Sequence, residues 1–351
     1  MRLNKKPVIR DFLITKSGYI FAVCDYFHPK SEVRAILRYV PDENGNRVMR
    51  LRYDDDSNSN TGYDTVFDAD LNVSKFNGKK YRKLGFDESY EFMRKHHPDW
   101  VKDVILVPDD EILKVLKPND AILKSIKSGK NSTLNKIIDF FYERGIPYEY
   151  MGVSGSILPG LESEGSDIDF VVYEKYWPVA QKAIESISKK QTNFSSNCDC
   201  DIKPLDLDLW KKVYEKRNSP LSFDTFLKHE KRKYNRGCVD GIYFDVLFVR
   251  DEKNAVPILR GRDKKRVAID AFVTDDSYSY DSPALYKIDH EIYSEVLSYT
   301  HSYAGQALKN EVIEVSGIEE DLGFTKRIVV GTKREPKDEW IISKTLIENE
   351  E

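Results

Sequence analysis

The first third of the chain alternates apolar and polar residues with the two-residue period that is typical of β-strands. This pattern predicts strands at residues 8–14, 19–25 and 33–40. A helical pattern with an acidic first turn follows at residues 87–96. We therefore expect a separate α+β domain over residues 1–125.

The middle of the chain changes to alternating helical and strand patterns. An amphipathic helix is expected over residues 131–144, where Gly145 and Pro147 end it. A short strand at 148–153 and a helix at 176–189 follow. These elements predict a second domain over residues 126–255, within which the long segment 190–235 has no clear assignment.

The last hundred residues return to strand patterns and predict a β-rich domain over residues 256–351. Apolar runs indicate strands at 267–273, 312–317 and 327–331, with a last strand at 337–342. Residues 281–296 are expected to include a helix, because Asp-Ser-Pro is a common start signal.

Two carboxylates spaced two residues apart suggest a metal site in the middle domain. Asp167 and Asp169 lead into an apolar run, so on a strand both would point to one face. They would repel each other unless a cation lay between them, and magnesium prefers such hard oxygen ligands. Upstream, Gly155 and Ser156 form a small-residue turn that lets the backbone approach phosphate oxygens. A helix beginning near Ser156 would add its dipole.

A third acid lies in a later apolar run. Asp240-Gly241 is a hairpin turn signal, and Asp245 follows within Ile-Tyr-Phe-Asp-Val-Leu-Phe-Val. A buried carboxylate in such a run is costly unless it is paired or binds a metal. The alternative is that Asp245 faces solvent on an edge strand.

A second Asp-x-Asp competes for the role of the third acid. Asp206 and Asp208 follow Pro204 and precede an apolar pair. This arrangement is more typical of a helix N-terminus than of a metal site.

Two basic stretches, residues 228–236 and 260–266, lie on either side of Asp245 in the sequence. Clusters of this kind can bind a triphosphate or a nucleic-acid backbone. The alternative is a solvated helix face and a linker. The candidate contacts are Lys231, Arg232, Lys233, Arg236, Arg260 and Arg262.

The order of these features over residues 131–250 resembles the catalytic core of the polymerase-β-type nucleotidyltransferase superfamily, in which Gly-Ser precedes an Asp-x-Asp strand and a later acid. The resemblance implies an α+β fold with a polymerase-β-like core, a mixed sheet with helices. It also implies transfer of NMP from an NTP such as ATP to an acceptor hydroxyl, with release of pyrophosphate. Asp167, Asp169 and Asp245 would be catalytic and would bind Mg²⁺ or Mn²⁺, and Gly155 and Ser156 would bind the nucleotide.

The resemblance leaves the acceptor open. RNA is one choice, with the C-terminal domain binding RNA or another substrate. A protein or small-molecule hydroxyl is the second, and a non-catalytic nucleotidyltransferase-like RNA-binding module is the third. The presence of all three acids favours an enzyme.

Composition indicates the class and location of the protein more than its function. The 351 residues are 40% apolar and 32% charged with a net charge of −4, which predicts an ordinary soluble protein without a global basic field. No apolar stretch is long enough to cross a bilayer, and the N-terminus lacks a signal-peptide core. The four cysteines are too scattered to predict a disulfide framework or a disulfide-linked partner. We therefore expect a cytoplasmic protein without a membrane partner.

Overall fold

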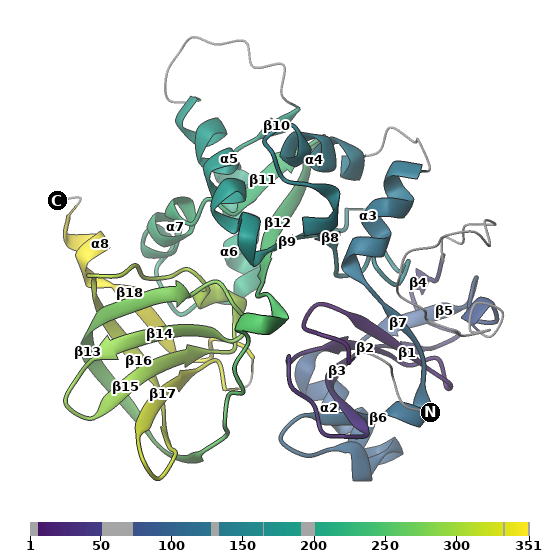
Figure 1. Ribbon diagram of the computed structural model, residues 1–351, viewed down its shortest axis with the longest axis horizontal. Helices are drawn as coiled ribbons and strands as arrows, with labels where there is room; N and C mark the ends of the chain where they lie inside the picture. The colour runs from purple at the N-terminus through teal and green to yellow at the C-terminus, as the bar shows by residue number, and fades with distance from the viewer. Residues whose placement is uncertain are drawn as a thin grey trace. The chain divides into compact units, whose positions relative to one another are not determined.

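The computed structural model describes residues 6–50, 73–127, 133–163, 165–190, 201–332 and 334–349. In these residues helices combine with three β-sheets, which confirms the predicted α+β class (Figure 1). The chain forms two compact units. Unit 1 contains residues 1–180, 198–202 and 238–255, and unit 2 contains residues 181–197, 203–237 and 256–351. The finer division at residues 125 and 255 stays a prediction.

The N-terminal sheet of unit 1 has the strand order β4-β5-β3-β2-β1-β7, with β6 paired to β3. Its strands are β1 (Phe12–Thr15), β2 (Ile20–Val23), β3 (Glu32–Pro41), β4 (Arg47–Val48), β5 (Lys80–Lys83), β6 (Ile105–Pro108) and β7 (Ile112–Leu116). The three strands predicted first are confirmed as β1, β2 and β3. Helix α2 (Phe86–His96) confirms the predicted helix, and its Met93 joins the buried cluster of this sheet.

The second sheet has the strand order β10-β11-β12-β9-β8. Its strands are β8 (Met151–Val153), β9 (Ile168–Tyr173), β10 (Ile202–Lys203), β11 (Arg236–Val239) and β12 (Ile242–Val249). Strands β9 and β12 run parallel, and β8 runs antiparallel to β9. The predicted Asp-Gly turn joins β11 to β12, and both of its residues have positive φ, as a tight hairpin requires.

Helices pack against one face of the second sheet. Phe141 of α4 (Thr133–Tyr142) stacks on Phe170 of β9, with 5.2 Å between ring centroids. Trp177, the first residue of α5 (Trp177–Lys190), meets Phe248 of β12 edge to face at 5.6 Å. Both predicted helices are therefore confirmed. Helix α3 (Pro118–Lys127) packs next to β8.

The opposite face of this sheet carries acidic residues near the start of β9 and β12 and an apolar cluster further along these strands. Val171 of β9 and Leu247 and Val249 of β12 form a buried cluster with Ile9. Because side chains alternate along a strand, Asp169 and Asp245 lie on this same face, two positions before Val171 and Leu247. The apolar cluster thus anchors the two strands directly behind the acids.

Unit 2 contains the third sheet. Its strands are β13 (Arg262–Tyr278), β14 (Ala284–Asp289), β15 (Tyr293–Ser298), β16 (Val312–Asp321), β17 (Lys326–Val330) and β18 (Trp340–Ser343). Pairings between β13 and β14, β14 and β15, β15 and β17, β17 and β16, and β16 and β13 close five of them into a ring, and β18 pairs with β16. Helix α8 (Lys344–Glu348) follows.

The predicted helix within residues 281–296 is wrong. The segment forms β14 and the start of β15, which pair antiparallel. Ala284, Tyr286 and Ile288 are buried while Lys287 and Asp289 are exposed, so the segment has the two-residue period of a strand. The start signal was present, but the apolar periodicity determined the structure.

The unassigned segment 190–235 contains two helices, α6 (Leu207–Arg217) and α7 (Phe223–Arg232), in the part that the structure describes. The Asp206 side chain caps α6 by accepting a hydrogen bond from the backbone N–H of Leu209 at 2.8 Å. This confirms that the second Asp-x-Asp begins a helix. Asp208 is exposed in the first turn.

Two exclusions drawn from the sequence can be examined in the described residues. None of the helices there is both long enough and apolar enough to cross a membrane. Cys24 and Cys238, the cysteines that the structure describes, are not joined in a disulfide. Cys198 and Cys200 lie outside the described residues.

Candidate functional site

Asp169 and Asp245 are neighbours across the central strand pair of the second sheet. The parallel register of β9 and β12 pairs their Cα atoms directly. Adjacent strands lie about 4.8 Å apart, so the two carboxylates share one face at close range. Asp245 is 4% exposed and Asp169 is half-buried. Since β12 lies between β11 and β9, the alternative that Asp245 faces solvent on an edge strand is wrong.

Asp167 joins this pair from the approach to β9. The strand begins at Ile168, so Asp167 stands one residue before it and is half-buried. Tyr39 of the N-terminal sheet lies close enough to Asp167 and Asp169 for their charges to affect its hydroxyl. Burial raises the pKa of the Tyr39 hydroxyl, nearby Arg47 and Arg38 lower this pKa, and the charges of Asp169 and Asp167 raise it further. Asp167 and Asp169 therefore both lie near Tyr39, a residue of the first sheet.

The Gly-Ser turn lies directly against the Asp169 carboxylate. The backbone N–H of Ser154 donates to the Asp169 carbonyl at 2.8 Å. Gly155 has φ +62°, and a Cβ at this position would lie 1.9 Å from Oδ2 of Asp169. Only glycine fits, because any side chain would both strain the backbone and collide with the acid. The turn predicted to hold phosphate therefore borders the candidate metal ligands.

The helix considered at Ser156 does not form. Residues 155–160 form successive turns, and the backbone N–H of Leu161 donates to the Ser156 carbonyl at 2.8 Å. A helix dipole therefore contributes nothing here. Any anion at this turn would be bound by local N–H and hydroxyl groups and by nearby cations.

Residues of the N-terminal sheet hold this turn, and sequence reasoning missed them. The buried Ser154 hydroxyl donates to the Arg10 carbonyl at 2.9 Å. Nη1 of Arg47 donates to the Leu161 carbonyl at 2.7 Å. The signal in the sequence was Ile157-Leu158 and Leu161, apolar residues in a turn that had to pack against something.

The donor set suits a metal ion that is shared with a substrate. In the described residues, no group of three or more His, Cys, Asp or Glu side chains is placed to hold a metal ion by itself. Magnesium in phosphate-transfer sites is usually bound by one or two carboxylates, with substrate phosphates and water completing its shell. The oxygens of Asp169 and Asp245, with Asp167 beside them, are ligands of the kind that Mg²⁺ or Mn²⁺ prefers.

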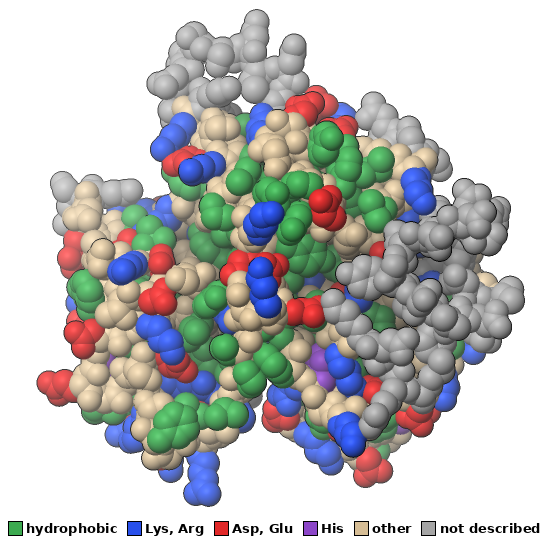
Figure 2. Space-filling model, viewed as in Figure 1, with side chains coloured by type: hydrophobic (Ala, Val, Ile, Leu, Met, Phe, Trp, Pro, Cys, Tyr) green, Lys and Arg blue, Asp and Glu red, His purple; other side chains and the backbone are tan. Residues whose placement is uncertain are grey.

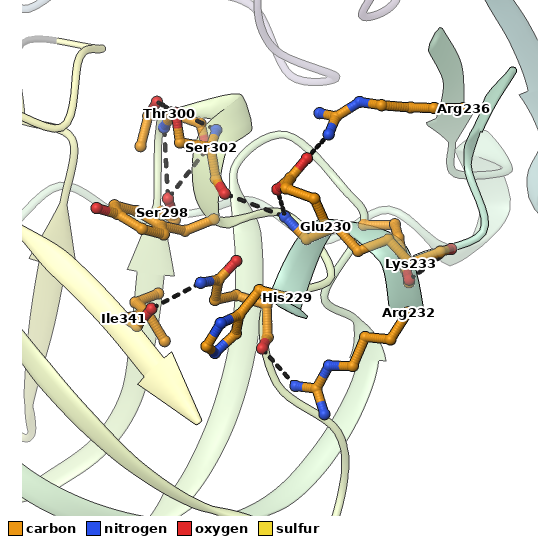
Figure 3. A network of polar contacts seen from close by, with 12 residues as sticks. His229, Glu230, Arg232, Lys233, Arg236, Ser298, Thr300, Ser302 and Ile341 are labelled. Carbon is orange, nitrogen blue, oxygen red and sulfur yellow. Dashed lines mark hydrogen bonds and ion pairs between the residues drawn. The ribbon is translucent and has the colours of Figure 1, made fainter. Parts of the chain in front are cut away.

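Most of the basic residues predicted to contact phosphate or nucleic acid have structural roles instead, beginning with α7. Figure 3 shows Glu230 between Lys233 and Arg236, and both cations pair with its carboxylate. All three side chains are buried, and Nζ of Lys233 also donates to the Ser302 carbonyl at 3.1 Å. The prediction is therefore corrected for Lys233 and Arg236, because a buried side chain with a carboxylate partner does not offer its charge to a nucleic-acid backbone.

Of the other four candidates, two form ion pairs with carboxylates and two are exposed. Arg232 binds both oxygens of Glu311, at 2.5 and 2.9 Å, and donates to the Gln306 carbonyl. Arg260 pairs with Asp263 and Glu320. Lys231 and Arg262 are exposed. On the face shown in Figure 2, basic side chains are interspersed with acidic ones and form no broad patch of one sign outside the grey residues.

Comparison with known proteins places this chain in a family. The chain is 34% identical over 362 residues to the uncharacterized protein MJ1086 of Methanocaldococcus jannaschii, and the match covers 96% of this chain and 98% of the relative. No family model and no solved structure matches the chain. Because the match runs over nearly the whole length of both proteins, the chain belongs to the same protein family as MJ1086.

Proposed function

We propose that this protein is a metal-dependent nucleotidyltransferase, which transfers NMP from an NTP to an acceptor hydroxyl and releases pyrophosphate. One observation carries the proposal: Asp245 lies in register beside Asp169 while Gly155 is pressed against the Asp169 carboxylate. Acids gathered next to a tight small-residue turn fit a site for a metal-bound triphosphate.

In the proposed reaction, each part of the site has a separate task. Asp167, Asp169 and Asp245 would hold Mg²⁺ or Mn²⁺, which when bound neutralises the triphosphate charge and makes the acceptor hydroxyl more acidic. Gly155 and Ser156 would bind the β- and γ-phosphates. Asp245, the most buried of the three acids, orients the acceptor and accepts its proton. The acceptor oxygen then bonds to the α-phosphorus as the bond to the β-phosphate oxygen breaks.

The acceptor is a matter for direct measurement. RNA was expected partly because of the basic stretches, but Lys233, Arg236 and Arg232 are committed to carboxylates. That weakens the argument for RNA relative to a protein or small-molecule hydroxyl. We also propose a cytoplasmic location, where NTPs are abundant and the thiols of Cys24 and Cys238 stay reduced.

The experiment is incubation with each NTP labelled at the α-phosphorus, with Mg²⁺, Mn²⁺ or a chelator. Total RNA, a protein lysate and a small-molecule extract are supplied as separate acceptors. We expect metal-dependent label in one of the three fractions. Label in none of them, together with metal-independent RNA binding, would replace the enzyme with a non-catalytic RNA-binding module.

Matched variants tie the activity to the site. Asp169→Ala is expected to abolish transfer while the protein stays folded. Asp208→Ala is the control, because Asp208 belongs to the look-alike Asp-x-Asp and its side chain is exposed on α6. Full activity of Asp169→Ala would overturn the assignment.

A further inference from the structure

The turn that follows Ser156 is built into the hydrophobic core of the N-terminal sheet. Leu161 is fully buried in a cluster with Phe12, Ile14 and Tyr39, and Leu158 packs against the same cluster. The turn is therefore not an independent loop of the second sheet. Its position is set by side chains of the first sheet.

Backbone contacts fix the same junction. The N–H of Arg50 donates to the Gly160 carbonyl at 2.8 Å. Gly160 has φ +66°, and a Cβ there would lie 2.4 Å from the Arg50 carbonyl oxygen. Such a close approach requires glycine and leaves the two segments little freedom to separate.

Arg47 lies at this junction and, in the part of the chain that the structure describes, donates one side-chain hydrogen bond. Its side chain is half-buried and donates Nη1–H to the Leu161 carbonyl, and its guanidinium carbon lies 6.0 Å from the centroid of the Tyr39 ring. Within the described residues it makes no ion pair with a carboxylate. A guanidinium has five N–H donors arranged to match phosphate oxygens, so the remaining donors suit an anionic ligand.

Tyr39 adds a neutral donor at the same place. Its side chain is 2% exposed, and its hydroxyl makes no hydrogen bond within the described residues. The charges of Asp167 and Asp169 act on this hydroxyl, as do those of Arg47 and Arg38. A cation and an unused hydroxyl therefore border the acids from the side of the N-terminal sheet.

We propose that Arg47 and Tyr39 bind the β- and γ-phosphates of the NTP together with the Gly155–Ser156 turn, so that the N-terminal sheet forms one wall of the nucleotide site. This inference rests on the proposed function. The competing explanation is that Arg47 only ties the turn to the sheet. The two differ in whether charge matters: Arg47→Gln keeps an N–H that can donate to the Leu161 carbonyl but removes the positive charge, so it weakens NTP binding only if Arg47 contacts phosphate.

The test measures binding of a non-hydrolysable NTP and of the matching NMP to the full chain with Mg²⁺. Arg47→Gln should weaken NTP binding roughly tenfold to a hundredfold, while NMP binding changes less than twofold. Tyr39→Phe should weaken NTP binding by a few-fold. Arg82→Ala is the control, because Arg82 lies on the neighbouring strand β5 and pairs with the partly exposed Asp42 and Glu88.

The outcomes separate this inference from the proposed function. If the wild-type protein binds NTP but Arg47→Gln binds NTP as tightly, or loses NTP and NMP binding equally, the phosphate contact is overturned and the function stands. If wild type binds no NTP, the function itself fails. If Arg47→Gln does not fold, Tyr39→Phe carries the comparison, and unchanged NTP affinity in that variant then overturns the contact.

Discussion

Two clusters of charged residues in this protein differ in what surrounds each charge. In unit 1, acid is placed beside acid, with Asp245 paired in register to Asp169. In unit 2, each acid is matched to bases: Glu230 to Lys233 and Arg236, Glu311 to Arg232. The first arrangement places like charges on neighbouring strands, and the second pairs opposite charges in the interior.

The difference distinguishes the site proposed to bind a metal ion from a scaffold of buried ion pairs. Like charges on one face are stabilised by a cation between them, so the proposed metal ion would stabilise the acids of unit 1. Opposite charges that are already buried together gain nothing from an added ion. Variants that remove one charge or one contact distinguish the two kinds of cluster.

The largest effect is expected from Asp245→Asn. Transfer should fall by at least about 10³-fold, because the amide neither holds the metal ion nor accepts the proton. Stability should stay the same or rise, since a like-charge contact with Asp169 is removed. Label transfer and chemical denaturation of the same preparation measure both quantities. A variant that loses stability and keeps its activity would contradict the distinction between the two clusters.

Glu230→Gln should give the opposite result. Removing this carboxylate leaves Lys233 and Arg236 buried next to each other, and breaking a buried pair in this way costs about 3–5 kcal/mol. Denaturant unfolding should show this loss. Glu185→Gln is the matched control, because it breaks a partly exposed pair with Lys189 on α5, for which a much smaller loss is expected. Equal losses in the two variants would show that the buried cluster is not essential to unit 2.

The fold was predictable where the pattern was local and strong. Alternating residues gave β1, β2 and β3, and the Asp-Gly pair gave the hairpin that carries Asp245. The segment at 281–296 failed because a start signal was given more weight than the two-residue burial pattern of β14. Local signals compete, and the competition is decided by what the segment packs against.

The candidate site was predictable only in part. The acids and the Gly-Ser turn share one short stretch, and the apolar run around Asp245 indicated a strand. The contacts of Tyr39 and Arg47 with this turn were not visible, because more than a hundred residues separate them from it. The buried pairs of Arg232, Lys233 and Arg236 were missed because a run of basic residues in sequence does not reveal its carboxylate partners.

A pH effect of intermediate size is expected in unit 2. His229 is fully buried, with Nδ1–H donating to the Thr225 carbonyl and Nε2 accepting from the Ser343 N–H, so it is held neutral. Burial lowers the pKa of His229 to about 4, against 6.5 in an exposed chain. The unfolded state therefore binds the proton first as pH falls. The contribution of neutral His229 to the free energy of unfolding should be fully present above pH 6.5. It should be lost, by about 3 kcal/mol, as the pH falls toward 4.

Denaturation midpoints at pH 7 and pH 5 measure this decline. His229→Gln should remove the part that belongs to this residue. His96→Gln, at an exposed position on α2, should leave the dependence unchanged. If His229→Gln and the wild type lost stability in parallel, the pH dependence would have to come from other groups, and neutral burial of His229 would not be its source.

The smallest effect is expected at the acid pair that looks like the candidate site in sequence. Asp206 caps α6, and Asp206→Ala should cost about 1 kcal/mol because the Leu209 N–H loses its acceptor. Transfer should not change, since Asp206 caps a helix and is not one of the proposed metal ligands. Asp206→Asn keeps a capping oxygen and should recover most of the stability. If Asp206→Ala instead abolished transfer with little loss of stability, the two Asp-x-Asp pairs would have exchanged roles, and a scaffold acid in unit 2 would have to be counted among the reacting groups.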